Sequence, residues 1–494
     1  MASDKFCREL RGEAQRWRED GLISDDQFRQ LAQQYQFEEL NTAARDRFVM
    51  ILLGLGSLLV GIGAITFVAA NWQALSQTIK AGILFTAMVM ADLSGFALVN
   101  RIAPNNRWQR LGQALLLLGA LLLGANLALM GQIVHTSGTR YELCAAWALG
   151  VLAMAYGVRL PFLAMLALLL LGIGYWSAFW DMMWLQAAWL GVWTLQMMPL
   201  IVTALFLPLA YRCRSQWLFA LTAIAMTSSL FVLILDVGRS LPPLLEALSL
   251  ILPYALLWAY DDTLWGVGRR WVQGRFSLGE AVFLGPAVSS STRPRPFPPQ
   301  AADRPFQPIA RGLMLFSLSV FYWVVSFQDA WLVGVGRELP AAPLQWQDTW
   351  LMVLLLLLFS AWTALSWGYL GWRPGRPGRL DSLSAVLLVF LLITAGVFFW
   401  ALVAGPIPIV ATTVFNILLA LMALGMMREG LGAGSRLPFW WGLVMLTLQI
   451  LSRVLEYETG LLIKSLVFVV CGIAVILVGL WFERYVRTLR VDSA

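Results

Sequence analysis

Residues 111–134 read LGQALLLLGALLLGANLALMGQIV, a run of 24 residues that contains no Asp, Glu, Lys or Arg. About 20 apolar residues in a helix are enough to cross a hydrocarbon core of ~30 Å. A second run, residues 380–403, reads LDSLSAVLLVFLLITAGVFFWALV and carries a single acidic residue near its start. Both runs predict helices that span a membrane rather than helices in the core of a soluble domain.

The composition of the whole chain agrees with this prediction. Of its 494 residues, 59% are hydrophobic and 13% are charged, whereas soluble domains are roughly half apolar and a quarter charged. The net charge of +7 would suggest nucleic acid as a partner of a soluble domain. Here the basic residues occupy short loops between apolar runs, so we expect membrane lipids and no nucleic acid as partners.

Apolar runs of spanning length recur along the chain. We predict an all-α fold, a polytopic transmembrane helix bundle of fourteen spans. Their approximate bounds are 48–70, 79–99, 111–133, 143–158, 160–180, 185–211, 217–235, 243–260, 311–335, 348–371, 381–403, 406–427, 438–452 and 461–482. The run at 438–452 is short, and Arg159 with Pro161 leaves a very tight connection between the fourth and fifth spans.

The distribution of basic residues gives the expected sidedness. With fourteen spans, 29 of the 35 Lys and Arg residues fall on one side of the membrane. Loops rich in Lys and Arg stay in the cytoplasm. We therefore expect both termini in the cytoplasm of a bacterium, with the protein in its inner membrane.

Polar segments divide the chain. Residues 1–47 are predicted to form a cytoplasmic helical hairpin, and residues 483–494 a cytoplasmic tail. Residues 261–310 begin with Asp261-Asp262, continue into a Pro/Arg-rich stretch and are typical of a cytoplasmic linker. This linker separates a membrane bundle of eight spans at 48–260 from one of six spans at 311–482.

The N-terminal hairpin is a candidate docking element. Gly21 separates its two helices, and Ser24 followed by Gln27 is typical of a capping box. An apolar stripe predicts the side chains that a protein partner would contact, namely Trp17, Phe28, Leu31 and Tyr35.

Three stretches resemble an uncharacterised bacterial family of multi-spanning membrane proteins, the domain-of-unknown-function family number twenty-one fifty-seven. They are residues 17–24 (WREDGLIS), 67–72 (FVAANW) and 131–138 (GQIVHTSG). The resemblance covers about the first third of the chain. It implies a bacterial inner-membrane protein, and it carries no activity over to this chain.

Ionisable and amide side chains inside spans are candidates for a polar or substrate path. Asp92 lies within the second span, where an ionised carboxylate is costly unless it is paired. It is either a functional group or a structural partner of Arg101 near the interface. Asn126, Gln132 and Asn416 also lie at membrane depth, although interhelical amide contacts explain such residues more often.

The outer loop after the third span holds His135, the only histidine, with Arg140 and Glu142. These residues are candidates for sensing pH or binding an anion, or they form local hydrogen bonds only. The four cysteines lack metal or redox spacing, and the chain has no nucleotide loop. We therefore expect no metal, cofactor or catalytic residues.

The sequence is compatible with two main functions. The first is a transporter or flippase-like carrier of an amphipathic or lipid-linked substrate, which suits many apolar spans with few charges. The second is a non-catalytic membrane scaffold or assembly factor that docks partners through its hairpin. An enzyme ranks third, because the predicted outer loops are short.

Overall fold

The computed structural model describes residues 4–34, 51–63, 66–67, 76–101, 107–133, 139–185, 189–238, 241–262, 306–333, 346–371, 381–432, 434–456 and 460–491. Within these ranges the regular structure is entirely helical. The chain forms two compact units, Met1–Gln186 and Ala187–Ala494, here called the N-terminal and the C-terminal unit. The predicted division at the linker stays a prediction, since residues 263–305 lie outside the described ranges.

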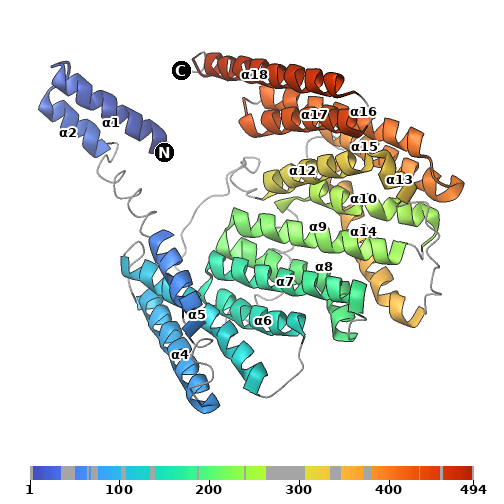
Figure 1. Cartoon of the computed structure of the whole chain (residues 1–494). Coiled ribbons are helices and arrows are strands. Elements are labelled where there is room, and N and C mark those ends of the chain that lie inside the picture. Colours follow the sequence, from blue (N-terminus) through green and yellow to red (C-terminus); the bar gives the residue numbers. More distant parts are fainter. Residues whose placement is uncertain are drawn as a thin grey trace, which may run out of the picture. The chain divides into compact units, whose positions relative to one another are not determined.

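The N-terminal unit begins with two polar helices, which are followed by apolar ones (Figure 1). Its labelled helices are α1 (Asp4–Glu19), α2 (Asp25–Gln34), α4 (Gln77–Arg101), α5 (Arg107–Ile133), α6 (Arg140–Val158) and α7 (Pro161–Leu185), with a further apolar helix at Ile51–Gly63. The α4 helix packs along α5, and α6 packs along α7.

The tight connection at Arg159 is present between α6 and α7. Arg159 adopts a left-handed conformation with φ 59°, and its N–H donates to Ala155 O. Pro161 then opens α7, a position where the missing N–H of proline costs nothing.

The capping box predicted at the start of α2 is confirmed. The backbone N–H of Ser24 donates to Gln27 Oε1 at 2.9 Å, and the N–H of Gln27 donates to Ser24 Oγ at 3.3 Å. Gly21, with φ 72°, lies in the turn after α1, where a residue without Cβ avoids strain.

The C-terminal unit is built around α10, in which residues 249–259 are all buried, as are residues 260–262 that follow it. A helix that is apolar on every face is stable only when other helices surround it, and α9, α12, α14 and α15 pack against α10. The helices of this unit are α8 (Trp189–Cys213), α9 (Gln216–Gly238), α10 (Pro243–Ala259), α12 (Gln307–Val325), α13 (Gln328–Val333), α14 (Trp346–Gly371), α15 (Ser382–Ala404), α16 (Pro408–Gly432), α17 (Arg436–Glu456) and α18 (Leu461–Val491).

The predicted all-α polytopic fold is confirmed. Among the described residues, 12 helices are long and apolar enough to cross a bilayer, and shorter apolar helices lie at Ile51–Gly63 and Pro243–Ala259. Each predicted span overlaps one of these helices, while the count of fourteen stays a prediction. The span predicted at 438–452 is longer in the structure, where α17 covers Arg436–Glu456.

The span predicted at 311–335 is divided into two helices in the structure. The sequence predicts a single helix over 311–335, but α12 ends at Val325 and α13 begins at Gln328. No proline or glycine lies between Arg311 and Val333 other than Gly312, so local sequence does not explain the break.

Candidate functional site

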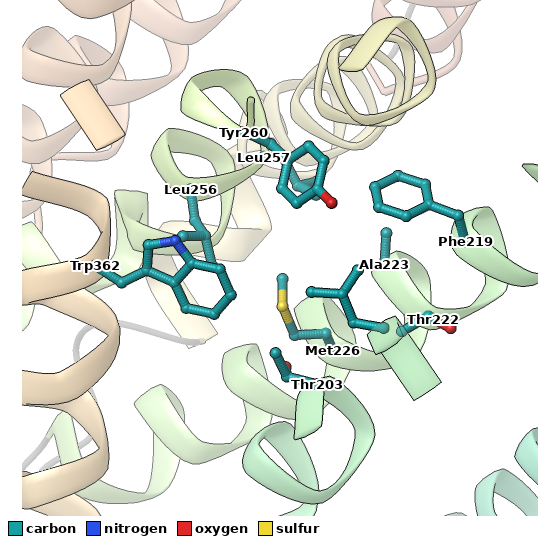
Figure 2. Close-up of a pocket in the computed structure, with 10 residues that line it drawn as sticks. Thr203, Phe219, Thr222, Ala223, Met226, Leu256, Leu257, Tyr260 and Trp362 are labelled. Atoms are coloured by element: carbon teal, nitrogen blue, oxygen red, sulfur yellow. The ribbon is translucent and has the colours of Figure 1, made fainter. Parts of the chain in front are cut away.

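An apolar cavity lies among α8, α9, α10 and α14 in the C-terminal unit (Figure 2). Its volume is about 30 Å³. Its lining residues are Thr203, Leu207, Phe219, Thr222, Ala223, Met226, Leu256, Leu257, Tyr260 and Trp362. Figure 2 shows the rings of Trp362, Tyr260 and Phe219 around this space, with the thioether of Met226 between α9 and α10.

The two threonines do not make the cavity polar. Thr203 Oγ1 donates to Pro199 O, and Thr222 Oγ1 donates to Leu218 O, each at 2.7 Å. Both hydroxyls are therefore satisfied by their own helices, as is common for Ser and Thr in spanning helices. The lining that remains consists of hydrocarbon, aromatic rings and one thioether.

A buried polar network begins at Tyr260, where α10 ends. Tyr211 donates its hydroxyl proton to Asp262 Oδ1 at 2.5 Å, and the hydroxyls of Tyr211 and Tyr260 lie 2.5 Å apart. Because Tyr211 has one proton and gives it to the carboxylate, Tyr260 is the donor to Tyr211.

The same carboxylate closes the N-terminus of α12. Asp262 Oδ2 accepts the backbone N–H groups of Phe306 at 3.1 Å and Gln307 at 2.9 Å. The first N–H groups of a helix have no partner within the helix and carry its positive dipole end. Asp262 therefore joins the two chain segments that flank residues 263–305.

Aromatic rings pack around this network, and a cation–π contact lies on the adjoining helices. The ring of Phe306 stacks on Phe219 with centroids 4.7 Å apart and meets Tyr211 edge-on at 4.8 Å. The guanidinium of Arg311 lies 4.8 Å from the ring centroid of Trp258. An apolar volume thus ends in a cluster of two hydroxyls and a carboxylate, and the Arg311–Trp258 contact lies on the adjoining helices α12 and α10.

Sequence reasoning missed Tyr211, Tyr260 and Phe306. It noted Asp261-Asp262 only as the start of the linker. Two acids directly after the apolar run at residues 247–259 were the available signal, because buried carboxylates require partners. Which tyrosine supplies that partner depends on the packing of α8 against α9 and α10, which spacing in the sequence does not give.

A second polar cluster surrounds the break between α12 and α13. Ser326 O accepts Arg453 Nη1 at 2.6 Å and Asn416 Nδ2 at 3.3 Å. The N–H of Gln328, which opens α13, donates to Glu456 Oε1 at 2.8 Å. Helix ends at membrane depth require such partners, so these side chains stabilise the break.

Further contacts hold this cluster together. Arg453 forms an ion pair with Glu456 and lies over the ring of Phe327, 4.3 Å from its centroid. Gln449 Nε2 donates to Asn416 O at 2.7 Å and to Asn416 Oδ1 at 3.1 Å. Asn416, predicted from sequence as a polar-path residue, is thus one member of an interhelical network.

In the N-terminal unit, Asp92 and Asn126 lie on one interface between α4 and α5. Asp92 Oδ1 is buried beside Gly119, where a Cβ atom would collide with it. Asn126 Nδ2 donates to Leu122 O at 2.9 Å and approaches Met88 Sδ at 3.9 Å. Asp92 Oδ1 and Asn126 Oδ1 have no hydrogen-bond partner among the described residues.

The other candidates from the sequence do not gather in one place. Gln132 is exposed near the end of α5. Glu142 belongs to the capping box of α6, where its Oε2 accepts the N–H of Thr139 at 3.0 Å. Arg140 is exposed in the first turn of α6, and His135 lies outside the described residues.

The hairpin residues are partly accessible. Trp17 is 37% exposed, while Phe28 and Leu31 are half-buried. The guanidinium of Arg18 lies 4.9 Å from the ring centroid of Phe28. Tyr35 lies outside the described residues.

A comparison with protein families gave one match, and it covers the part of the chain that holds Asp92 and Asn126. Residues 15–164 match the family model described as predicted membrane protein (DUF2157). The resemblance inferred from sequence is therefore confirmed over this range. No curated protein and no solved structure matches the chain.

The DUF2157 match separates the candidate residues into two sets. The α4 and α5 helices, with Asp92 and Asn126, lie within residues 15–164. The cavity and the Asn416 cluster lie in the C-terminal unit, beyond the matched range. The DUF2157 description adds that this is a membrane protein and gives no activity.

Proposed function

We propose that this protein is a carrier that moves an amphipathic or lipid-linked substrate through the membrane. The observation that supports the proposal is the apolar cavity of the C-terminal unit, which ends in the Tyr211–Tyr260–Asp262 network. Its volume of about 30 Å³ is well below the roughly 300–1,000 Å³ found for small-molecule sites, so a substrate would have to move the lining side chains apart to enter.

The chemistry of the cavity favours a chain-like apolar group. Each buried CH₂ group contributes ~0.8 kcal/mol, and the lining offers no free hydroxyl at Thr203 or Thr222 to compete. A polar headgroup would then lie beside Tyr260, with Asp262 and Arg311 nearby. A zwitterionic or phosphate-bearing headgroup suits this mixture of charges.

The test is photocrosslinking in vesicles that contain the full-length protein. The probes are a phospholipid with a diazirine in one acyl chain and an isoprenyl phosphate with the same group. We expect adducts on the cavity-lining residues of α9 and α10, mapped by mass spectrometry. Lipid-facing adducts spread evenly over the spans would contradict the proposal.

A matched pair of variants sharpens this test. Ala223→Phe fills the cavity from α9, whereas Ile224→Phe changes a neighbouring side chain that is 50% exposed. We expect Ala223→Phe to lose most cavity adducts and Ile224→Phe to keep them. Equal adduct yields in both variants would count against the cavity as the binding site.

The scaffold alternative has one observation in its favour. Leu22, between α1 and α2, is 72% exposed, and Trp17 is accessible beside it. Exposed large apolar groups on a small polar element are typical of a docking surface. Deleting residues 1–40 should then remove a stoichiometric partner from the purified complex, while the carrier proposal predicts unchanged lipid adducts.

We place the carrier in the inner membrane of a bacterium with both termini in the cytoplasm. The support is the asymmetry of 29 against 6 basic residues between the two predicted faces.

A further inference from the structure

Asp92 is an acidic residue in the middle of a spanning helix. The span in α4 covers Ile79–Val99, and only 17% of its most apolar window is buried within the protein. Most of this window is therefore exposed among the described residues, and Asp92 lies about two turns from the end of the span. Its side chain is half-buried against α5.

Gly119 creates the space that the carboxyl group occupies. A Cβ atom at this position would collide with Asp92 Oδ1, and it would lie 3.1 Å from Oδ2. The neighbouring positions on the two helices are apolar, with Ala91 and Leu122 in one buried cluster. The carboxyl group is thus held against the backbone of α5.

No cation compensates this carboxyl group within the described residues. On α4 itself, Arg101 is nine residues away and Lys80 twelve, or ~14 and ~18 Å along the helix axis. On α5 the charged residues are Arg107 and Arg110, and Arg110 is nine residues from Gly119. The helix at Ile51–Gly63 carries no ionisable side chain.

The α6 helix, which also packs against α5, provides no partner for Asp92 among the described residues. The ionisable residues of α6 are Arg140, Tyr141, Glu142, Cys144 and Tyr156. The α6 helix packs against α5, and no ion pair or hydrogen bond joins any of these side chains to Asp92 in the described part of the chain.

An unpaired carboxylate at this depth is strongly disfavoured, whereas a protonated carboxyl group is not. We propose that Asp92 is a proton-binding site inside the bilayer, able to exchange its proton with water. Binding takes up one proton and forms the O–H bond of the carboxylic acid. Asn126 Oδ1, an unpartnered acceptor on α5 seven residues from Gly119, lies on the same interface and offers a site for a water.

This site needs no assumption about the carried substrate. It lies in the N-terminal unit, and its protonation can be measured without any substrate. A negative result in the crosslinking test would therefore not contradict the proton-binding site. Likewise, the absence of a label at Asp92 would not contradict the carrier proposal.

The experiment uses N,N′-dicyclohexylcarbodiimide on the full-length protein in native membranes. This apolar reagent takes the proton of a carboxylic acid on nitrogen while the carboxylate adds to its carbon, and the adduct rearranges to a stable N-acylurea. Mass spectrometry assigns the label to a residue. We expect labelling of Asp92 at pH 6 that weakens as the pH is raised to 8.

Two exposed acids serve as internal controls. Asp329 and Asp381 are exposed and lie outside the long apolar helices, so they should stay unlabelled, because the apolar reagent concentrates in the bilayer. The variant Asp92→Asn should lose the label, and Ala223→Phe should keep it. No label at Asp92 between pH 6 and 8, or equal labelling of all three acids, would overturn the proposal.

Discussion

At the scale of single residues, Asp262 joins a helix end to a tyrosine pair. It accepts a hydrogen bond from Tyr211 and two from the backbone at the start of α12. Asp262 is 6% exposed, so water cannot replace these partners. A buried charge with three donors is stabilised only while all of them are present.

We predict that Asp262→Asn destabilises the protein by about 1–3 kcal/mol, since the amide keeps one acceptor oxygen and loses the charge. Thermal unfolding in detergent measures the change. Asp381→Asn is the matched control, because Asp381 precedes α15 without a side-chain cap and is exposed. Equal shifts in the two variants would mean that the network at Asp262 contributes no stability.

At the scale of elements, glycines allow α4 and α5 to approach closely. A Cβ atom at Gly95 would lie 2.9 Å from Gly112 O, and one at Gly112 would lie 2.9 Å from Gly95 O. Contact between small residues brings two backbones together in a membrane, where dispersion forces drive helix association. In the helix at Ile51–Gly63, a Cβ atom at Gly61 would lie 3.0 Å from Leu121 Cδ1, whereas Cβ atoms at Gly54, Gly56 and Gly63 would meet nothing within 4 Å.

We expect Gly95→Val to destabilise the N-terminal unit by about 1–3 kcal/mol, because overpacking forces the helices apart. Gly82→Val is the control on the same helix, since a Cβ at Gly82 meets nothing within 4 Å. Cysteine crosslinking between α4 and α5, read during a thermal ramp, reports the loss of the interface. Identical melting of both variants would contradict a glycine-dependent contact.

At the scale of the whole molecule, sidedness is the property most open to measurement. A fluorescent protein fused after residue 494 should fluoresce, and alkaline phosphatase at the same place should be inactive. Fusions after Gly405, between α15 and α16, should give the opposite pair of results. The reason is that the asymmetry of basic residues predicts the end of the chain inside and this connection outside. The same result at both places would require an even number of spans between them.

The sequence by itself determined the all-α membrane class, the approximate place of the spans and the family match over residues 15–164. These follow from hydrophobicity and helix length, which each segment carries without reference to its neighbours. Only the tertiary structure decided that Asp92 faces Gly119, that α12 breaks at Ser326 and that Tyr260 joins a cavity to Asp262. The reason is that these features depend on which helix faces which. In spans that are apolar on most sides, the order of residues alone does not specify that choice.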